Sequence, residues 1–75
     1  MNNERRKRIT TVMYKLEEVK NEIEDICDEE QEAFDNMPAG IQESERGERM
    51  QEAIDNLESA VYNVGEAVDY LLGIE

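Results

Sequence analysis

The apolar residues of this chain recur at alternating intervals of three and four, and this spacing restricts its possible folds more than any other feature. The first series consists of Ile9, Val12, Leu16, Val19, Ile23, Ile26, Ala33 and Met37, with Glu30 at the one position of the series that is not apolar. The second series consists of Met50, Ile54, Leu57, Val61, Val64, Val68 and Leu71. Residues three and four apart lie on the same face of a helix. Both segments are therefore predicted to be amphipathic helices with a heptad seam, formed in the first segment by positions a (from Ile9) and d (from Val12).

The ends of the two predicted helices are marked by turn and capping residues. Pro38 follows the first series, and the residue before a proline is biased away from helical geometry. Ser44 is a candidate N-cap of the second helix, and Gly73 is a candidate C′ glycine at its end. We therefore expect one all-α domain, an antiparallel two-helix hairpin with helices at about 3–36 and about 45–72.

The apolar stripe is wider than a two-stranded coiled coil requires, because position e of the first segment holds Met13, Cys27 and Phe34. In the second segment three alanines recur every seven residues, which suits close helix packing but also reflects the high helix propensity of alanine. A single hairpin would leave one flank of each stripe in water, so we predict a homodimer that forms a four-helix bundle. The expected oligomer interface consists of Ile9, Leu16, Ile23, Ile26, Phe34, Ala53, Leu57, Ala60, Val64, Ala67 and Leu71.

Carboxylates are concentrated in the stretch EDICDEEQEAFDN, residues 24–36, within a chain of 20 acidic and 8 basic residues and a net charge of −12. Most of them fall outside the predicted seam and should face water. A solvated helix face is one interpretation, and a surface that docks on a basic partner is the other. The expected partner-binding face consists of Glu24, Asp25, Asp28, Glu29, Glu32 and Asp35.

Glu30 differs from the other acids because it falls at position a, where a buried carboxylate is costly unless it is paired. In an antiparallel hairpin that turns near residue 40, Glu30 lies roughly level with Arg46 and Arg49. We expect an ion pair between Glu30 and Arg49, or Arg46, that fixes the register of the hairpin. The alternative interpretation is a metal ligand or catalytic acid.

A basic cluster, Arg5 to Arg8, occupies the first turns of the first helix, where cations are unfavourable beside the positive end of the helix dipole. We expect the C-terminal end of the second helix, with Asp69 and Glu75, to neutralise it. Nucleic-acid binding by this cluster is opposed by the charge of the rest of the chain.

Enzymatic chemistry has little support in the sequence. The chain has no histidine and no Gly-rich phosphate loop, so catalytic triads and the usual zinc sites are excluded. The pairs Glu29-x-x-Glu32 and Glu52-x-x-Asp55 fit the spacing of all-α nucleotide pyrophosphatases that hold Mg²⁺ on helical carboxylates, but the same spacing recurs by chance in so acidic a chain. We expect a protein that is not an enzyme, with no catalytic residues, no metal and no cofactor.

The cellular setting follows from the same composition. The single cysteine, Cys27, allows no intramolecular disulfide and is interpreted as a small core residue. The charged start MNNERRKR lacks the pattern of a signal peptide, and no apolar stretch approaches the ~20 residues that cross a bilayer. We expect a cytoplasmic protein that does not enter membranes.

The segments DEEQEAFDNMP, SERGERMQEAIDNLE and MNNERRKR resemble those of small acidic proteins of unknown function encoded by phages and prophages of Gram-positive bacteria. The resemblance covers nearly the whole chain. It implies a small helical protein that acts by binding and that interferes with host machinery or defence. It supplies no catalytic residues.

The leading functional hypothesis is a self-associating, non-enzymatic module whose acidic helix face docks on a basic host protein surface, as an inhibitor or in place of nucleic acid. One alternative is a structural or assembly bundle with no charge-dependent partner. The other is the Mg²⁺-dependent nucleotide hydrolase.

Overall fold

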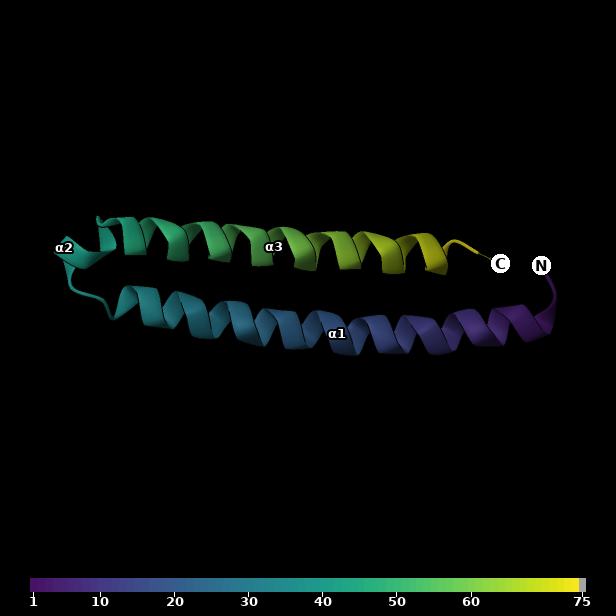
Figure 1. Cartoon of the computed structure of the whole chain (residues 1–75). Helices are drawn as coiled ribbons and strands as arrows, with labels where there is room; N and C mark the ends of the chain where they lie inside the picture. The colour runs from purple at the N-terminus through teal and green to yellow at the C-terminus, as the bar shows by residue number, and fades with distance from the viewer. Residues whose placement is uncertain (75) are drawn as a thin grey trace.

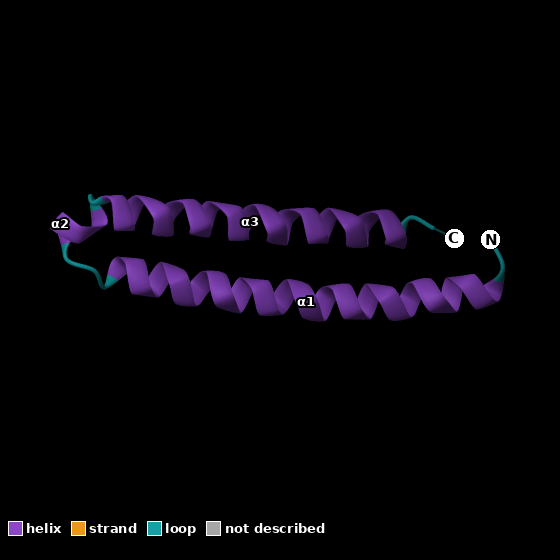
Figure 2. Ribbon diagram, viewed as in Figure 1, coloured by secondary structure: helices purple, strands orange, loops and turns teal. Residues whose placement is uncertain are grey.

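The fold is a hairpin of two long helices, seen in a computed structural model that describes residues 1–74. Helix α1 spans Asn3–Asp35, the short helix α2 spans Ala39–Gln42, and helix α3 spans Glu45–Leu72. α1 and α3 lie side by side and run in opposite directions, so α1 begins and α3 ends at the same end of the hairpin (Figure 1). Residues 1–74 contain helices and loops and no strand (Figure 2). The predicted all-α helical hairpin is confirmed.

Helix α1 begins and ends close to the predicted residues. Asn2 is its N-cap, and the Oδ1 atom of Asn2 accepts a hydrogen bond of 2.9 Å from the backbone N–H of Arg5. This bond satisfies one of the four N–H groups that a helix start leaves without a partner. The C-cap is Asn36, two residues before Pro38.

The turn contains a feature that the periodicity does not predict, the one-turn helix α2. The carbonyl oxygen of Pro38 accepts hydrogen bonds from the backbone N–H groups of Ile41 and Gln42, at 2.9 and 3.0 Å. The side-chain amide of Gln42 donates a bond of 2.8 Å to the carbonyl oxygen of Phe34. This bond satisfies a carbonyl near the end of α1 and holds the turn against that helix.

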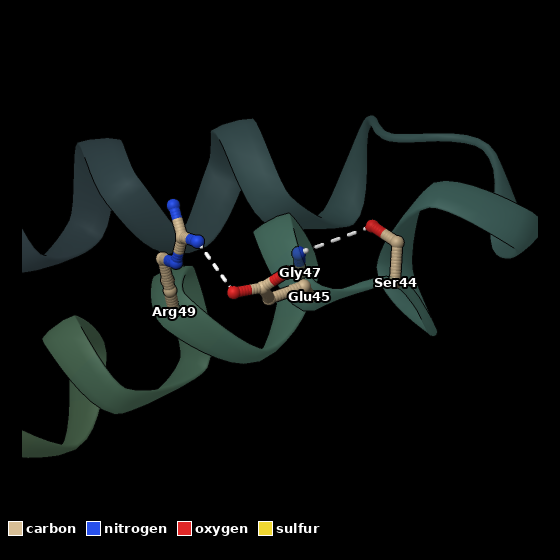
Figure 3. A network of polar contacts seen from close by, with 4 residues as sticks. All are labelled: Ser44, Glu45, Gly47 and Arg49. Carbon is tan, nitrogen blue, oxygen red and sulfur yellow. Dashed lines mark hydrogen bonds and ion pairs between the residues drawn. The ribbon is translucent and has the colours of Figure 1, made fainter.

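The start of α3 is capped as predicted. Ser44 has extended backbone geometry, and its Oγ atom accepts a hydrogen bond of 3.4 Å from the backbone N–H of Gly47 (Figure 3). Gly47 is buried, and a Cβ atom at this position would lie 2.0 Å from the carbonyl oxygen of Gln42. α2 can therefore pack this closely on α3 only because residue 47 has no side chain.

The end of α3 departs from the expected glycine cap. Gly73 is the C-cap with φ −73° and ψ −6°, which are right-handed helical values and not the left-handed ones of a C′ glycine. Its backbone N–H bonds back to the carbonyls of Asp69 and Tyr70, at 3.2 Å each. The helix thus ends by tightening its last turn, which any residue can do.

The seam between the long helices uses different rows of α1 from those predicted. The buried and half-buried positions that form it on α1 are Ile9, Met13, Leu16, Lys20, Ile23, Cys27, Glu30 and Phe34, and the half-buried Met37 continues the series just after the helix. These are heptad positions a and e. Position d is left outside, because Val12, Val19 and Ile26 are 45%, 46% and 47% exposed. Position a of the first helix lies in the seam as predicted, but the prediction that position d also lies there is wrong.

The apolar stripe of α1 has three rows, at positions a, d and e, and one partner helix cannot cover all three. In the hairpin, α3 covers the a row and the e row, which contains Met13, Cys27 and Phe34. The same row contains Lys20, which fits because Gly65 lies opposite. A Cβ atom on Gly65 would be 4.0 Å from Cε of Lys20, so the lysine stem lies where a side chain of α3 would otherwise be.

The seam of α3 is the predicted one. Ile54 and Val68 are 1% and 4% exposed, and Met50, Leu57, Val61, Val64 and Leu71 are half-buried. Together with Cys27, these two residues are the only buried apolar side chains of residues 1–74. The hairpin therefore has a narrow core and a large apolar area that remains partly in water.

Candidate functional site

The acidic surface predicted for partner binding lies on the outer side of α1. We use this name for Glu24, Asp25, Asp28, Glu29, Glu32 and Asp35. All are exposed except Glu24, which lies beside the seam and is half-buried. Because α1 is regular from Asn3 to Asp35, five of these carboxylates follow one another over three helical turns on the side facing away from α3.

The acidic surface is not neutralised within the chain. The only ion pair of the described residues joins Arg49 and Glu45, both in α3 (Figure 3). Asp35 accepts a hydrogen bond of 3.0 Å from the side-chain amide of Gln31, and this contact brings no positive charge. The carboxylates therefore present an unbalanced negative field to any molecule that approaches α1.

The ion pair expected to fix the register is not formed. Nη2 of Arg49 lies 2.5 Å from Oε1 of Glu45, one turn away on the same helix, while Glu30 is half-buried and has no cationic partner among residues 1–74. An i, i+4 partner is within reach without any tertiary contact. Glu30 keeps access to water, so its charge needs no partner. The register is set by the apolar seam.

A second acidic site, which the sequence analysis missed, crosses from α1 to α3. A shallow groove passes over Gly65 and Lys20, and its carboxylates are Glu17, Glu24, Glu58, Glu66 and Asp69. We call it the acidic groove. In the sequence, this groove is indicated by the acids that flank the seam on both helices and by a glycine inside a helical series. The acidic groove extends the negative surface from the outer side of α1 to α3.

Cys27 is a core residue and not a reactive thiol. It is 8% exposed, and its Sγ atom donates a weak hydrogen bond of 3.9 Å to the carbonyl oxygen of Ile54. Burial, and then the charges of Glu58 and Asp28, raise the pKa of the Cys27 thiol above its ordinary value. The thiolate, which is the nucleophilic form, is therefore disfavoured at neutral pH.

The carboxylates of the hydrolase interpretation do not come together. Glu29, Glu32, Glu52 and Asp55 are all exposed, two on α1 and two on α3. Residues 1–74 contain no group of three acidic or cysteine side chains arranged to hold a metal ion. The geometry therefore gives this chemistry no support.

Most residues expected at the oligomer interface lie in the hairpin's own seam. Ile9, Leu16, Ile23, Phe34, Leu57, Val64 and Leu71 are half-buried between α1 and α3. Ile26 is exposed. Ala53, Ala60 and Ala67, which we call the alanine row, are half-buried beside the seam. Ile26 and the alanine row are thus the predicted interface residues that lie outside the seam.

The basic start of α1 is exposed, and none of its four cations has an ion pair within the described part of the chain. Nη1 of Arg6 donates a hydrogen bond of 3.3 Å to Oδ1 of Asn3. Asp69, one expected neutralising group, makes no ion pair, and Glu75, the other, lies outside the described residues. Arg5 and Arg8 flank a small apolar groove at the open end of the hairpin.

Comparison with known proteins gives no match to this chain, whether with family models, with curated proteins or with solved structures. Within residues 1–74, neither long helix has a stretch sufficiently long and apolar to cross a bilayer. Inference about function therefore depends on the surfaces of the hairpin.

Proposed function

We propose that the protein is a self-associating, non-enzymatic interaction module whose acidic surface docks on a basic surface of another protein. The cytoplasm is the proposed setting, and a host protein bound by a phage or prophage product is the proposed context. The phage context rests on the sequence resemblance alone. The docking rests on the geometry of the hairpin.

The observation that carries the proposal is the absence of internal partners for the acidic surface. Five exposed carboxylates lie on one side of α1, and none of them has an ion pair within residues 1–74. Charges packed this closely on one helix repel one another and lower its stability, by ~0.2–0.5 kcal/mol for each like pair at i, i+4. The cations of a basic partner would offset this repulsion, and their attraction to the carboxylates would favour binding.

The spacing of the carboxylates suits a broad basic surface better than a single cation. Acids one turn apart are separated by about 5.4 Å along the helix, which is loosely comparable with the spacing of backbone phosphates. The acidic groove continues this field onto α3. Such a surface accelerates association with a basic partner, and the acceleration falls as salt is added.

The test compares two variants that each remove four charges. The acidic-surface variant carries D25N, D28N, E32Q and D35N. The α3 control variant carries E43Q, E48Q, E52Q and D55N, all at exposed positions of the turn and α3 that lie outside the acidic groove. Partners are captured from a bacterial lysate on each tagged protein at 50 and 300 mM NaCl, and released with duplex DNA.

We expect wild type and the α3 control variant to capture the same basic protein, and the acidic-surface variant to lose it. Release by duplex DNA would indicate that the acidic surface occupies a nucleic-acid site. Equal recovery of every protein by all three would reject the acidic-surface proposal and leave a structural bundle. Circular dichroism of each variant controls for folding.

A further inference from the structure

The rows that the hairpin leaves outside its seam lie together on one side of the molecule. On α1 they are Val12, Val19, Ile26 and Ala33, which we call the flank row, and on α3 they are the alanine row. Glu17 and Glu24 of α1 border the acidic groove together with Glu58 and Leu72 of α3. These four residues therefore mark one side of the seam. The flank row and the alanine row are on the other side of the seam positions in their own helices, so they share the opposite side.

This side is the one with the fewest carboxylates. Beyond the flank row, the next row of α1 is Arg8, Lys15, Glu22 and Glu29, and beyond the alanine row the next row of α3 is Arg49, Asn56, Asn63 and Tyr70. Apart from Glu29, which belongs to the acidic surface and also borders this face, the carboxylates of the acidic surface and the acidic groove lie on the outer side and the opposite side. A chain of net charge −12 therefore keeps one long apolar face with little net charge.

The charges along this face are self-complementary. Arg8 and Lys15 precede Val19, Glu22 and Glu29 follow it, and the four are spaced seven residues apart. All four are exposed and none has an ion pair within residues 1–74. If a second α1 runs antiparallel with Val19 on the two-fold axis, Lys15 lies beside Glu22 of the second copy, and Arg8 beside Glu29 of the second copy.

The apolar rows fit the same axis. Val12 then faces Ile26 of the second copy, and Val19 faces its own equivalent. Cys27 contacts Ile54 and Lys20 lies against Gly65, so Val19 is level with the stretch of α3 between Ala60 and Ala67. The same axis therefore places Ala60 of one copy opposite Ala67 of the other, where small side chains let the two α3 helices approach closely.

We infer that a second copy of this chain docks on the face formed by the flank row and the alanine row, antiparallel, with α1 on α1 and Val19 at the two-fold axis. The inference rests on the self-association in the proposed function and gives it a face, an orientation and a register. The 28 residues of α3 make this face about 40 Å long and about 20 Å wide, or ~800 Å² for each copy, which is the size of a standard stable interface. The resulting bundle has its two turns at opposite ends and both acidic surfaces outermost, except for Glu29, which lies at the edge of the interface.

Charge exchange tests the register. K15E places two glutamates together at each of two symmetric contacts, and E22K places two lysines together there. We expect each single variant to raise the dimer dissociation constant about tenfold or more, and the K15E/E22K double variant to restore it to within about threefold. An equimolar mixture of the K15E and E22K chains should form mixed dimers in preference to either homodimer. The measurements are sedimentation equilibrium and native mass spectrometry.

Cross-linking tests the axis without altering charge. In a C27A background, V19C should give a disulfide-linked dimer on mild oxidation, because residue 19 faces its own equivalent. E18C, one residue away on the outer side of α1, is the matched control and should remain monomeric on a denaturing gel. Circular dichroism establishes that every variant is folded.

The outcomes separate the two levels of the proposal. A wild-type chain that sediments as a monomer at all concentrations would overturn both the docking face and self-association. A dimer that tolerates K15E and E22K separately, or that cross-links equally through residues 18 and 19, would overturn the face and register while leaving self-association intact.

Discussion

Gly47 lies against Gln42 so closely that a Cβ atom on residue 47 would be 2.0 Å from the Gln42 carbonyl oxygen. The obstacle is backbone, so no side chain can rotate away to make room. The contact joins the first turn of α3 to α2, and the cap from Ser44 ends on the same Gly47 N–H. The close return of the chain at the turn therefore depends on one glycine.

Gly47→Ala should destabilise the hairpin by about 2 kcal/mol or more, because α2 must move away from α3 and the packing of the turn is lost. Gly40→Ala is the matched control. No atom lies within 4 Å of a Cβ built on Gly40, so this change should be neutral or slightly stabilising. Urea denaturation followed by circular dichroism measures both, and equal stability of the two variants would contradict the role of Gly47.

Gly65→Ala should have the opposite sign, although Gly65 also lies inside α3. A Cβ there would meet Cε of Lys20 at 4.0 Å, which is an ordinary contact with the end of a flexible side chain. Alanine is favoured over glycine inside a helix by about 1 kcal/mol, so the variant should be more stable by roughly that amount. A larger residue, as in Gly65→Leu, should displace Lys20 and remove the gain. Thermal unfolding measures the series.

The sequence predicts the two long helices almost to the residue because their limits are set by local signals. Ser44 caps α3 by accepting a hydrogen bond from a backbone N–H three residues later, and Pro38 disfavours continuation of α1. Neither effect needs tertiary structure. The acidic surface was also predictable, since regular helical geometry places those carboxylates away from the seam.

The choice of seam could not be predicted from the same pattern. The stripe of α1 is three rows wide, and by composition the row with Lys20 is less suited to burial than the row with Val12, Val19 and Ile26. It is buried because Gly65 leaves space on the other helix. The importance of Gly47 likewise depends on where α2 folds back. Such relations arise between residues distant in the chain, which periodicity does not describe.

The unfolding free energy should depend on pH through Cys27. Burial, and then Glu58 and Asp28, raise the thiol pKa above its unfolded value of 9.0, so the folded protein holds this proton more tightly than the unfolded chain. The resulting stability is fully present below about pH 9 and is lost as the pH rises through the folded pKa. As the pH rises above about 9, wild type should therefore lose stability faster than Cys27→Ala. Parallel pH profiles of the two proteins would rule out this contribution.

The stability of the hairpin should rise with salt, because the carboxylates of the acidic surface repel one another. The screening length falls from about 10 Å at 0.1 M salt to about 3 Å at 1 M. The acidic-surface variant should be more stable than wild type by about 1 kcal/mol at low salt, and the difference should shrink at 1 M NaCl. Melting temperatures across a NaCl series measure this. If the gain persists unchanged at 1 M, it comes from helix propensity and not from charge.

The position of both helix ends at one end of the hairpin decides how the molecule responds to mechanical load. A force applied between the start of α1 and the end of α3 pulls across the seam at its open end. The two helices would then separate progressively from the open end toward the turn, one layer of side chains at a time, and each step would require little force. A pull between the turn and either terminus would instead load the long axis of one helix, so the same hairpin should yield easily in the first direction and resist in the second.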